Sequence, residues 1–390
     1  MKKITYLLLI LSQCMFSQLI LKKVVNAQEL VSNLAGNAKN VRITNPKITQ
    51  QKQTFATFNT NLKYNNFMDS GIIMSTGLAK DAKGPNKQQN KTSHINFISD
   101  EDINIIAKRK GCYDTSLFEF DLISETDQIQ FNYVFASEEY PEYVNKNVND
   151  IFIFLVTNTQ TGTSENIAIL NGDKNTPITV DHINPSKNSN YYIPNAQFNK
   201  ELLKNTENLK QIELAYSFQY DGFTTKLTAT AKVKPYVTYH FKLGISDVGD
   251  HNFDSAIFLE ANSLRSNGKK PELKEALTNF KDELSLDFDI NFENNSANLK
   301  GNNSYLLLDN IIKALINNPT IFLKIIGHTD KNGTESNNLK LSLKRAKSVS
   351  NYLTKHGINP NRIIVEGLGD KQLKSNLNSE NRRVEIIFKH

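Results

Sequence analysis

Short alternating or apolar runs recur along residues 29–265 and predict strands. In Leu117–Ile123, three apolar side chains fall on one face of an extended chain and two acids, Glu119 and Asp121, on the other, which predicts a half-buried strand. Asp150–Thr157 is apolar on both faces and predicts a central strand. The predicted strands are Ser70–Ser75, Leu117–Ile123, Ile129–Ala136, Asp150–Thr157, Leu227–Val233 and Tyr239–Ser246. Many short strands divided by Asn, Gly, Pro and Asp turns predict an all-β, sandwich-like domain, with one surface helix at Glu201–Leu209.

The pattern changes after residue 265. Residues 266–283 begin with Ser-Asn-Gly-Lys-Lys-Pro, which predicts a linker, and a charged stretch at Glu272–Leu284 follows as a candidate helix. The elements that follow are a strand at Leu284–Phe292, a helix at Ser304–Ile316, a strand at Ile321–Ile326, a helix at Ser336–Lys355, and strands at Arg362–Gly367 and Arg383–Phe388. This β-α-β-α-β-β order predicts that residues 284–390 form an α/β sandwich with both helices on one face of a mixed sheet. On the long helix, the apolar stripe expected to face the sheet is Leu339, Leu343, Ala346, Val349 and Leu353.

The first residues predict export. Lys2 and Lys3 precede an apolar run at Ile4–Leu11, which is too short to span a bilayer and fits a secretory signal peptide. Cleavage after Ser17 is preferred, giving a signal peptide of residues 1–17, and cleavage after Ala27 is the alternative. Lipidation at Cys14 is a further alternative. We expect no transmembrane segment in the mature chain.

Composition narrows the class of protein. Apolar residues make up 39% and charged residues 22% of the 390 residues, which is typical of a globular chain. The net charge of +6 comes from scattered basic residues, so nucleic-acid binding is not expected. Of the two cysteines, only Cys112 would remain after signal removal, so no internal disulfide is expected.

The C-terminal segment carries a series of spaced motifs. Ile326-Gly327-His328-Thr329-Asp330 is followed by Asn338–Ala346, then by Gly367-Leu368-Gly369 and by Asn381–Ile386 (NRRVEI). In this order the motifs resemble the OmpA/MotB-type C-terminal domain. The resemblance implies non-covalent binding to peptidoglycan through its diaminopimelate. It implies that Asp330 and Arg345 contact this group, and that Thr329, Asn338, Arg382 and Arg383 assist.

The residue types suit such a ligand. The free end of diaminopimelate carries one ammonium and one carboxylate, so its receptor needs a fixed anion and a fixed cation. Asp330 follows a strand and supplies the anion, while the planar guanidinium of Arg345 binds a carboxylate with two parallel hydrogen bonds. Asn338 and Arg345 are seven residues apart and share one flank of the helix, so we expect Arg345 to lean toward Asp330.

The N-terminal region carries motifs of its own. They include Ser70–Gly77 (SGIIMSTG), Phe135–Tyr140 (FASEEY), Tyr220–Thr224 (YDGFT) and Asp254–Phe258 (DSAIF). Together they resemble the choice-of-anchor L domain of bacterial exported proteins. In that family such domains are joined to different C-terminal anchors, and an OmpA-like module fits the anchor position.

Acidic residues gather at the predicted strand ends of this domain. Hard cations such as calcium bind carboxylates and carbonyls at such positions, although the spacing is not that of an EF-hand loop. The candidate calcium ligands are Glu138, Glu139, Asp150, Asp247, Asp250 and Asp254. Turn capping and surface solvation are the alternative explanation, and no other cofactor is expected.

We therefore expect a non-catalytic cell-envelope protein, in the periplasm or associated with the outer membrane. Its C-terminal domain would hold peptidoglycan, and its β-rich domain would bind an unknown envelope or extracellular ligand, as in adhesion. The alternative is an enzyme that acts on a wall or surface polymer and is targeted by the OmpA-like domain. Glu138 and Glu139 are the paired carboxylates that such an enzyme would suggest, but neighbours on a strand point to opposite faces.

Overall fold

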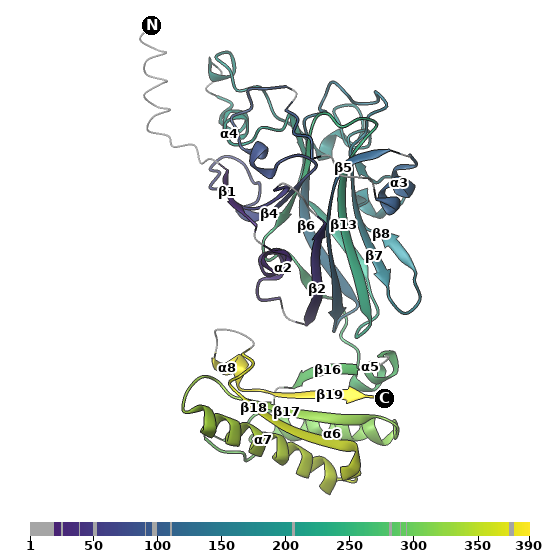
Figure 1. The fold of residues 1–390 in the computed structure, drawn as a ribbon, viewed down its shortest axis with the longest axis vertical. Helices are drawn as coiled ribbons and strands as arrows, with labels where there is room; N and C mark the ends of the chain where they lie inside the picture. Colours follow the sequence, from purple (N-terminus) through teal and green to yellow (C-terminus); the bar gives the residue numbers. More distant parts are fainter. Residues whose placement is uncertain are drawn as a thin grey trace. The chain divides into compact units, whose positions relative to one another are not determined.

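The computed structural model describes residues 19–390 except 25, 39, 50–52, 90, 96–99, 110, 205–206, 281–282, 289, 294 and 374–377. The predicted signal peptide, residues 1–17, lies outside the described residues. The chain divides into two compact units, residues 1–233 with 238–269 and residues 234–237 with 270–390 (Figure 1). Within the described part of the chain, no helix is both long and apolar enough to cross a membrane.

The N-terminal unit contains two sheets. The first has the order β1 (Ile20–Lys23), β3 (Phe55–Asn59), β4 (Ser70–Ser75), β14 (Ser255–Glu260), β6 (Gln128–Ser137), β11 (Gly222–Thr224) and β10 (Tyr192–Pro194), with β12 (Leu227–Lys232) and β15 (Arg265–Asn267) also paired to β6. The second has the order β2 (Val41–Thr49), β5 (Cys112–Ser124), β13 (Thr238–Val248), β7 (Ile151–Asn158) and β8 (Ser164–Asn166), with β9 (Ile178–Thr179) on β7. All six predicted strands are confirmed.

An aromatic core joins the two sheets. Phe131 of β6 contacts Phe154 of β7 with ring centroids 4.9 Å apart, and Tyr133 contacts Phe152 at 5.4 Å. Phe118, Phe120 and Leu122 of β5 are fully buried, as the alternation predicts. Because rings of one sheet contact rings of the other, the unit is a sandwich, and the predicted fold class is confirmed.

The helices of this unit are short. They are α2 (Ala27–Ala35), α3 (Glu101–Ala107) and α4 (Leu209–Ser217), with 3₁₀ turns at Ala79–Ala82, Leu170–Gly172, Ser189–Tyr191 and Leu202–Lys204. The helix predicted at Glu201–Leu209 is therefore misplaced, since α4 begins where that prediction ends. Asn208 is the reason: its side chain accepts a hydrogen bond from the Gln211 amide (3.2 Å) and caps the helix start.

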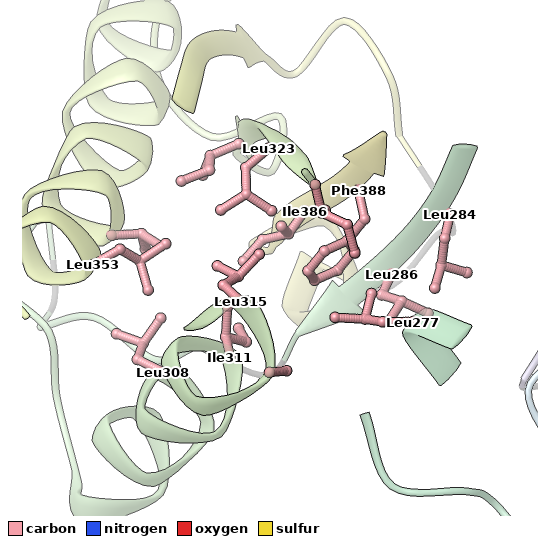
Figure 2. Packing of buried hydrophobic residues seen from close by; sticks show 14 of the residues in the cluster. Leu277, Leu284, Leu286, Leu308, Ile311, Leu315, Leu323, Leu353, Ile386 and Phe388 are labelled. Atoms are coloured by element: carbon pink, nitrogen blue, oxygen red, sulfur yellow. The ribbon is translucent and has the colours of Figure 1, made fainter. Parts of the chain in front are cut away.

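The C-terminal unit is a four-stranded sheet with the order β16 (Glu283–Phe288), β19 (Val384–Lys389), β17 (Phe322–His328) and β18 (Ile363–Gly369). Only the β17–β18 pairing is parallel. The helices are α6 (Asn302–Ile316), α7 (Glu335–Lys355) and the short α8 (Asn378–Asn381), with a 3₁₀ turn at Pro360–Arg362. The two long helices share one core with the sheet, in which Leu315 of α6 and Leu353 of α7 lie with Ile386 of β19 (Figure 2). The mixed sheet and the β-α-β-α-β-β order agree with the prediction.

The segment predicted as a linker, residues 266–283, is largely structured. Its first residues continue β15, and α5 (Leu273–Asn279) belongs to the C-terminal unit. Ala276, Leu277 and Phe280 are each at most 5% exposed and join the C-terminal core. Three apolar side chains in an otherwise charged stretch give this helix a buried face, which average composition does not reveal.

Candidate functional site

Helix α7 lies directly against the ends of β17 and β18. A Cβ on Gly327 would lie 2.1 Å from the Ser342 carbonyl oxygen, and one on Gly367 would lie 2.5 Å from the Leu343 nitrogen. Only glycine permits this approach. Ser342 is therefore fully buried against the sheet, while Leu339 is 39% exposed, so the predicted stripe is wrong in the first half of the helix. Its second half is buried at Ala346, Val349 and Leu353.

Asp330 lies just beyond the end of β17 and is 7% exposed. Its Oδ1 accepts a hydrogen bond from the Asn332 amide (3.0 Å), and its carbonyl accepts one from Asn338 Nδ2 (3.2 Å). Its Oδ2 forms an ion pair with Arg382 Nη1 at 2.7 Å. The Asn332 amide and the Arg382 guanidinium thus fix the carboxylate, and Asn338 fixes the backbone that carries it.

Arg345 lies beside this carboxylate without pairing to it. The residue is 7% exposed, its Nε donates to the Ser296 carbonyl (3.1 Å), and the central carbon of its guanidinium lies 5.1 Å from the centre of the Phe292 ring. Among the described residues Arg345 forms no ion pair. Burial lowers its pKa, the charge of Arg382 lowers it further, and Asp330 raises it. Arg345 therefore contacts Ser296 and Phe292, and Arg382, not Arg345, forms the ion pair with Asp330.

The other predicted residues do not all face this centre. Thr329 is 3% exposed, its amide donates to the Gly369 carbonyl (2.9 Å), and its hydroxyl has no partner in the described part of the chain. Arg383 faces a different loop, since both its Nη atoms lie 3.4 Å from the Gln372 carbonyl. His328 is fully buried, with Nε2 3.4 Å from Glu385 Oε2, which supports a structural role.

The arrangement presents one carboxylate and two guanidinium groups at one edge of the sheet. Such a set attracts an anionic group to the arginines and offers Asp330 to a cationic one. Arg382 is 47% exposed, so its side chain has room to turn toward a ligand. Ser296 and Phe292, which hold Arg345, were not predicted. The strand predicted at Leu284–Phe292 ends at Phe288, so both residues lie in the loop between β16 and α6, where an aromatic residue among polar ones is the sequence signal.

The candidate calcium ligands of the N-terminal domain are brought together in part. Five of the six are at most 3% exposed, namely Glu138, Glu139, Asp150, Asp247 and Asp254. Asp250 is only half-buried and accepts from the Asn252 amide (2.9 Å). Glu138 and Glu139 have different charged neighbours. The charges of Asp221 and Asp254 raise the pKa of Glu138, whereas Asp150 is the charge that raises the pKa of Glu139 most. No three carboxylate, imidazole or thiolate groups among the described residues are arranged to hold a metal ion.

Comparison with known families identifies the family of the N-terminal domain. A family model of the choice-of-anchor L domain matches residues 20–265, which is more than half of the 390 residues. The chain belongs to the choice-of-anchor L family. A second model, of the OmpA family, matches residues 291–386. Both resemblances seen in the motifs are confirmed, and this choice-of-anchor L protein carries an OmpA domain at its C-terminal side.

Relatives match part of the chain only. Outer membrane protein A of Bordetella avium is 52% identical over 66 residues, covering 16% of this chain and 34% of that protein. Peptidoglycan-binding protein ArfA of Mycobacterium tuberculosis is 38% identical over 88 residues, covering 21% of this chain and 27% of its own. The peptidoglycan-associated lipoprotein of Burkholderia pseudomallei is similar in structure, with 25% identity, 28% of this chain and 91% of that chain covered, and a TM-score of 0.23. The chain thus spans about a third or less of the length of these two curated relatives.

Proposed function

We propose that this protein is an exported, non-catalytic component of the bacterial cell envelope. Its OmpA domain binds peptidoglycan without a covalent bond, and its choice-of-anchor L domain binds another envelope component or an extracellular ligand. The OmpA family match and the peptidoglycan-binding relatives support the first part. The basic start and short apolar run at the N-terminus support export to the periplasm or the outer membrane.

The observation that carries the proposal is the buried Asp330 carboxylate beside Arg345 and Arg382. Diaminopimelate ends in an ammonium and a carboxylate on one carbon. Asp330 accepts the ammonium, and Arg345 and Arg382 bind the carboxylate. The ligand carboxylate relieves the repulsion between the two guanidinium groups, so the empty site favours a zwitterion over a simple cation. Thr329 and Asn338 supply further polar contacts at the same edge.

Co-sedimentation of the full chain with purified sacculi tests the proposal. Asp330→Asn keeps the shape of the side chain but removes its charge, and Arg345→Ala removes one guanidinium. Losing one partner of a buried charged contact costs about 2–5 kcal/mol, so each variant should bind at least about tenfold more weakly. Lys344→Ala is the matched control, since Lys344 is an exposed charge on the same helix as Arg345. Unchanged binding of folded Asp330→Asn and Arg345→Ala would contradict the proposal.

A further inference from the structure

Six carboxyl groups of the N-terminal domain meet at one end of its two sheets. We define the carboxylate cluster as Glu138, Glu139, Asp150, Asp221, Asp247 and Asp254. The first residue of β14 pairs with the last residue of β6, so Asp254 and Glu138 are neighbours, and the Glu138 amide donates to the Asp254 carbonyl (3.1 Å). In the other sheet the end of β13 pairs with the start of β7, which places Asp247 near Asp150. The cluster thus lies across both sheets.

The cluster is closed to solvent, and several of its oxygens have no partner. No member is more than 6% exposed. Both carboxyl oxygens of Glu138 and of Asp247 are buried without a hydrogen-bond partner among the described residues, as is Oδ2 of Asp254. Buried polar atoms in folded proteins are nearly always hydrogen-bonded. Exceptions gathered in one place therefore point to a ligand that these oxygens bind.

Basic side chains compensate little of this charge: Lys91 acts on Asp254 and lowers its pKa without forming an ion pair with it. Within the described residues no Lys, Arg or His forms an ion pair with a cluster member, and the nearby Lys91 pairs with Asp81 (3.6 Å). Burial above all, followed by the charge of Asp221, raises the pKa of Glu138 to about 10. Burial also raises the pKa of Asp150 to about 8. Buried carboxylates without a counter-charge are strongly unfavourable, so they need either protons or a cation.

We propose that the carboxylate cluster binds one hard divalent cation of the calcium class, held between Asp247 and Asp254. The donors are all oxygens, which Ca²⁺ prefers, and Ca²⁺ completes its six to eight ligands with hydroxyl, carbonyl and water oxygens. Thr76 and Ser255 supply hydroxyl groups at the same sheet end, where Thr76 Oγ1 accepts from the Ser255 amide (2.9 Å). In the proposed site two carboxylates supply the charge, and hydroxyl, carbonyl and water oxygens complete the shell.

Gly77 leaves room for one of the two ligands. A Cβ at this position would lie 1.8 Å from Asp254 Oδ2, so any larger residue would displace the carboxylate. The other oxygen of Asp254 accepts from the Ser93 amide (3.0 Å), which fixes the direction of the unpartnered one. The orientation of Asp254 is therefore built into the fold.

Binding at this position would tie the two sheets together. Asp247 belongs to β13 of the second sheet, and Asp254 leads into β14 of the first. The residue before it, Phe253, packs against Tyr143 with ring centroids 4.3 Å apart and the rings tilted by 32°, and both line a polar cavity of about 620 Å³. The cation would hold the loop that forms one wall of this cavity.

Isothermal titration of the calcium-depleted full chain with CaCl₂ tests the proposal. The expected result is one ion per chain. Asp247→Asn should bind at least tenfold more weakly, and Asp173→Asn should bind as the natural chain does. Asp173 is a matched control because it lies on an exposed turn, where it accepts from the Thr176 hydroxyl (2.6 Å). A natural chain that binds no calcium at millimolar concentration would overturn the proposal and leave protonated acids as the explanation.

Thermal unfolding separates ion binding from a general loss of structure. Calcium should raise the Tm of the natural chain above its value in EDTA. The Asp247→Asn variant should show no such rise, yet its Tm in EDTA should not fall below that of the natural chain, because the amide removes an uncompensated charge. Asp254→Asn serves as the second variant if the first does not fold. An equal response to calcium in both variants and the natural chain would overturn the assignment of these ligands.

Discussion

The contact between β17 and β19 predicts a specific loss of stability in acid. Glu385 on β19 is 20% exposed, its Oε2 lies 3.4 Å from His328 Nε2, and the Ser285 hydroxyl donates to its Oε1. The contact with His328 is the largest cause that brings the pKa of Glu385 from 4.5 down to about 2, with burial opposing it and Ser285 adding to it. At about 1.36 kcal/mol for each pKa unit, the ionised group stabilises the fold by about 3 kcal/mol at most.

The sign follows from the lowered pKa. The stabilisation is fully present above the unfolded-state pKa of 4.5 and is lost as the pH falls toward about 2. The perturbation is Glu385→Gln, which removes the titration. The free energy of unfolding of the natural chain should exceed that of the variant by about 3 kcal/mol at pH 7, and the difference should shrink toward zero by pH 2.

Denaturant unfolding of both proteins at pH 7, 5, 4, 3 and 2 measures this difference, and subtraction cancels every titration that the two proteins share. Glu366→Gln is the control, because the side chain of this acid on β18 is 40% exposed. The free energy of unfolding of this variant should stay within about 0.5 kcal/mol of that of the natural chain at every pH. If the free energies of unfolding of the natural chain and of Glu385→Gln differ by the same amount from pH 7 to pH 2, the reasoning is refuted.

Three further predictions concern the orientation of α7, the support of the site and the processing of the N-terminus. Leu353→Ala should cost about 2–5 kcal/mol in denaturant unfolding because the side chain is fully buried, while Leu339→Ala on the same helix should cost about 0.5 kcal/mol or less; the reverse order would contradict the orientation of α7. Gly327→Ala should lower the stability of the fold and weaken sacculus binding. The new Cβ would meet the Ser342 carbonyl oxygen at 2.1 Å, so α7 must shift. Unchanged sacculus binding would contradict the link between the position of α7 and the site. Mass spectrometry of the exported protein should find a mature N-terminus at Gln18, because cleavage after Ala27 would remove β1, which pairs with β3; a start at Gln28 would speak against this.

Local patterns in the sequence were sufficient to predict the buried face of an element where its own periodicity decides that face. The alternation in β5 predicts its buried face, since the pleat alone decides it. The same reasoning fails for α7. There the burial of Ser342 in place of Leu339 depends on glycines of two distant strands, which the helical period does not contain. The charged stretch at Glu272–Leu284 was likewise a candidate helix, which α5 confirms, but the sequence does not show which core its apolar face joins.

The candidate sites were predictable in their residues more than in their contacts. Motifs identified Asp330 and Arg345, but the ion pair of Asp330 with Arg382 spans 52 positions and depends on where β19 begins. Ser296 and Phe292 hold Arg345 from a loop that no motif marks. In the N-terminal domain, the acids seen in separate turns become one buried cluster only because both sheets end at the same place.

The central claim is that Asp330, Arg345 and Arg382 recognise the two opposite charges of diaminopimelate. Isothermal titration of the full chain with a soluble muropeptide tests it most directly, using one peptide with a free diaminopimelate carboxylate and one in which that carboxylate is amidated. The natural chain should bind the free acid at least about tenfold more tightly than the amide, and Arg345→Ala should lose most of this preference. Equal affinity of the natural chain for both peptides would contradict the account.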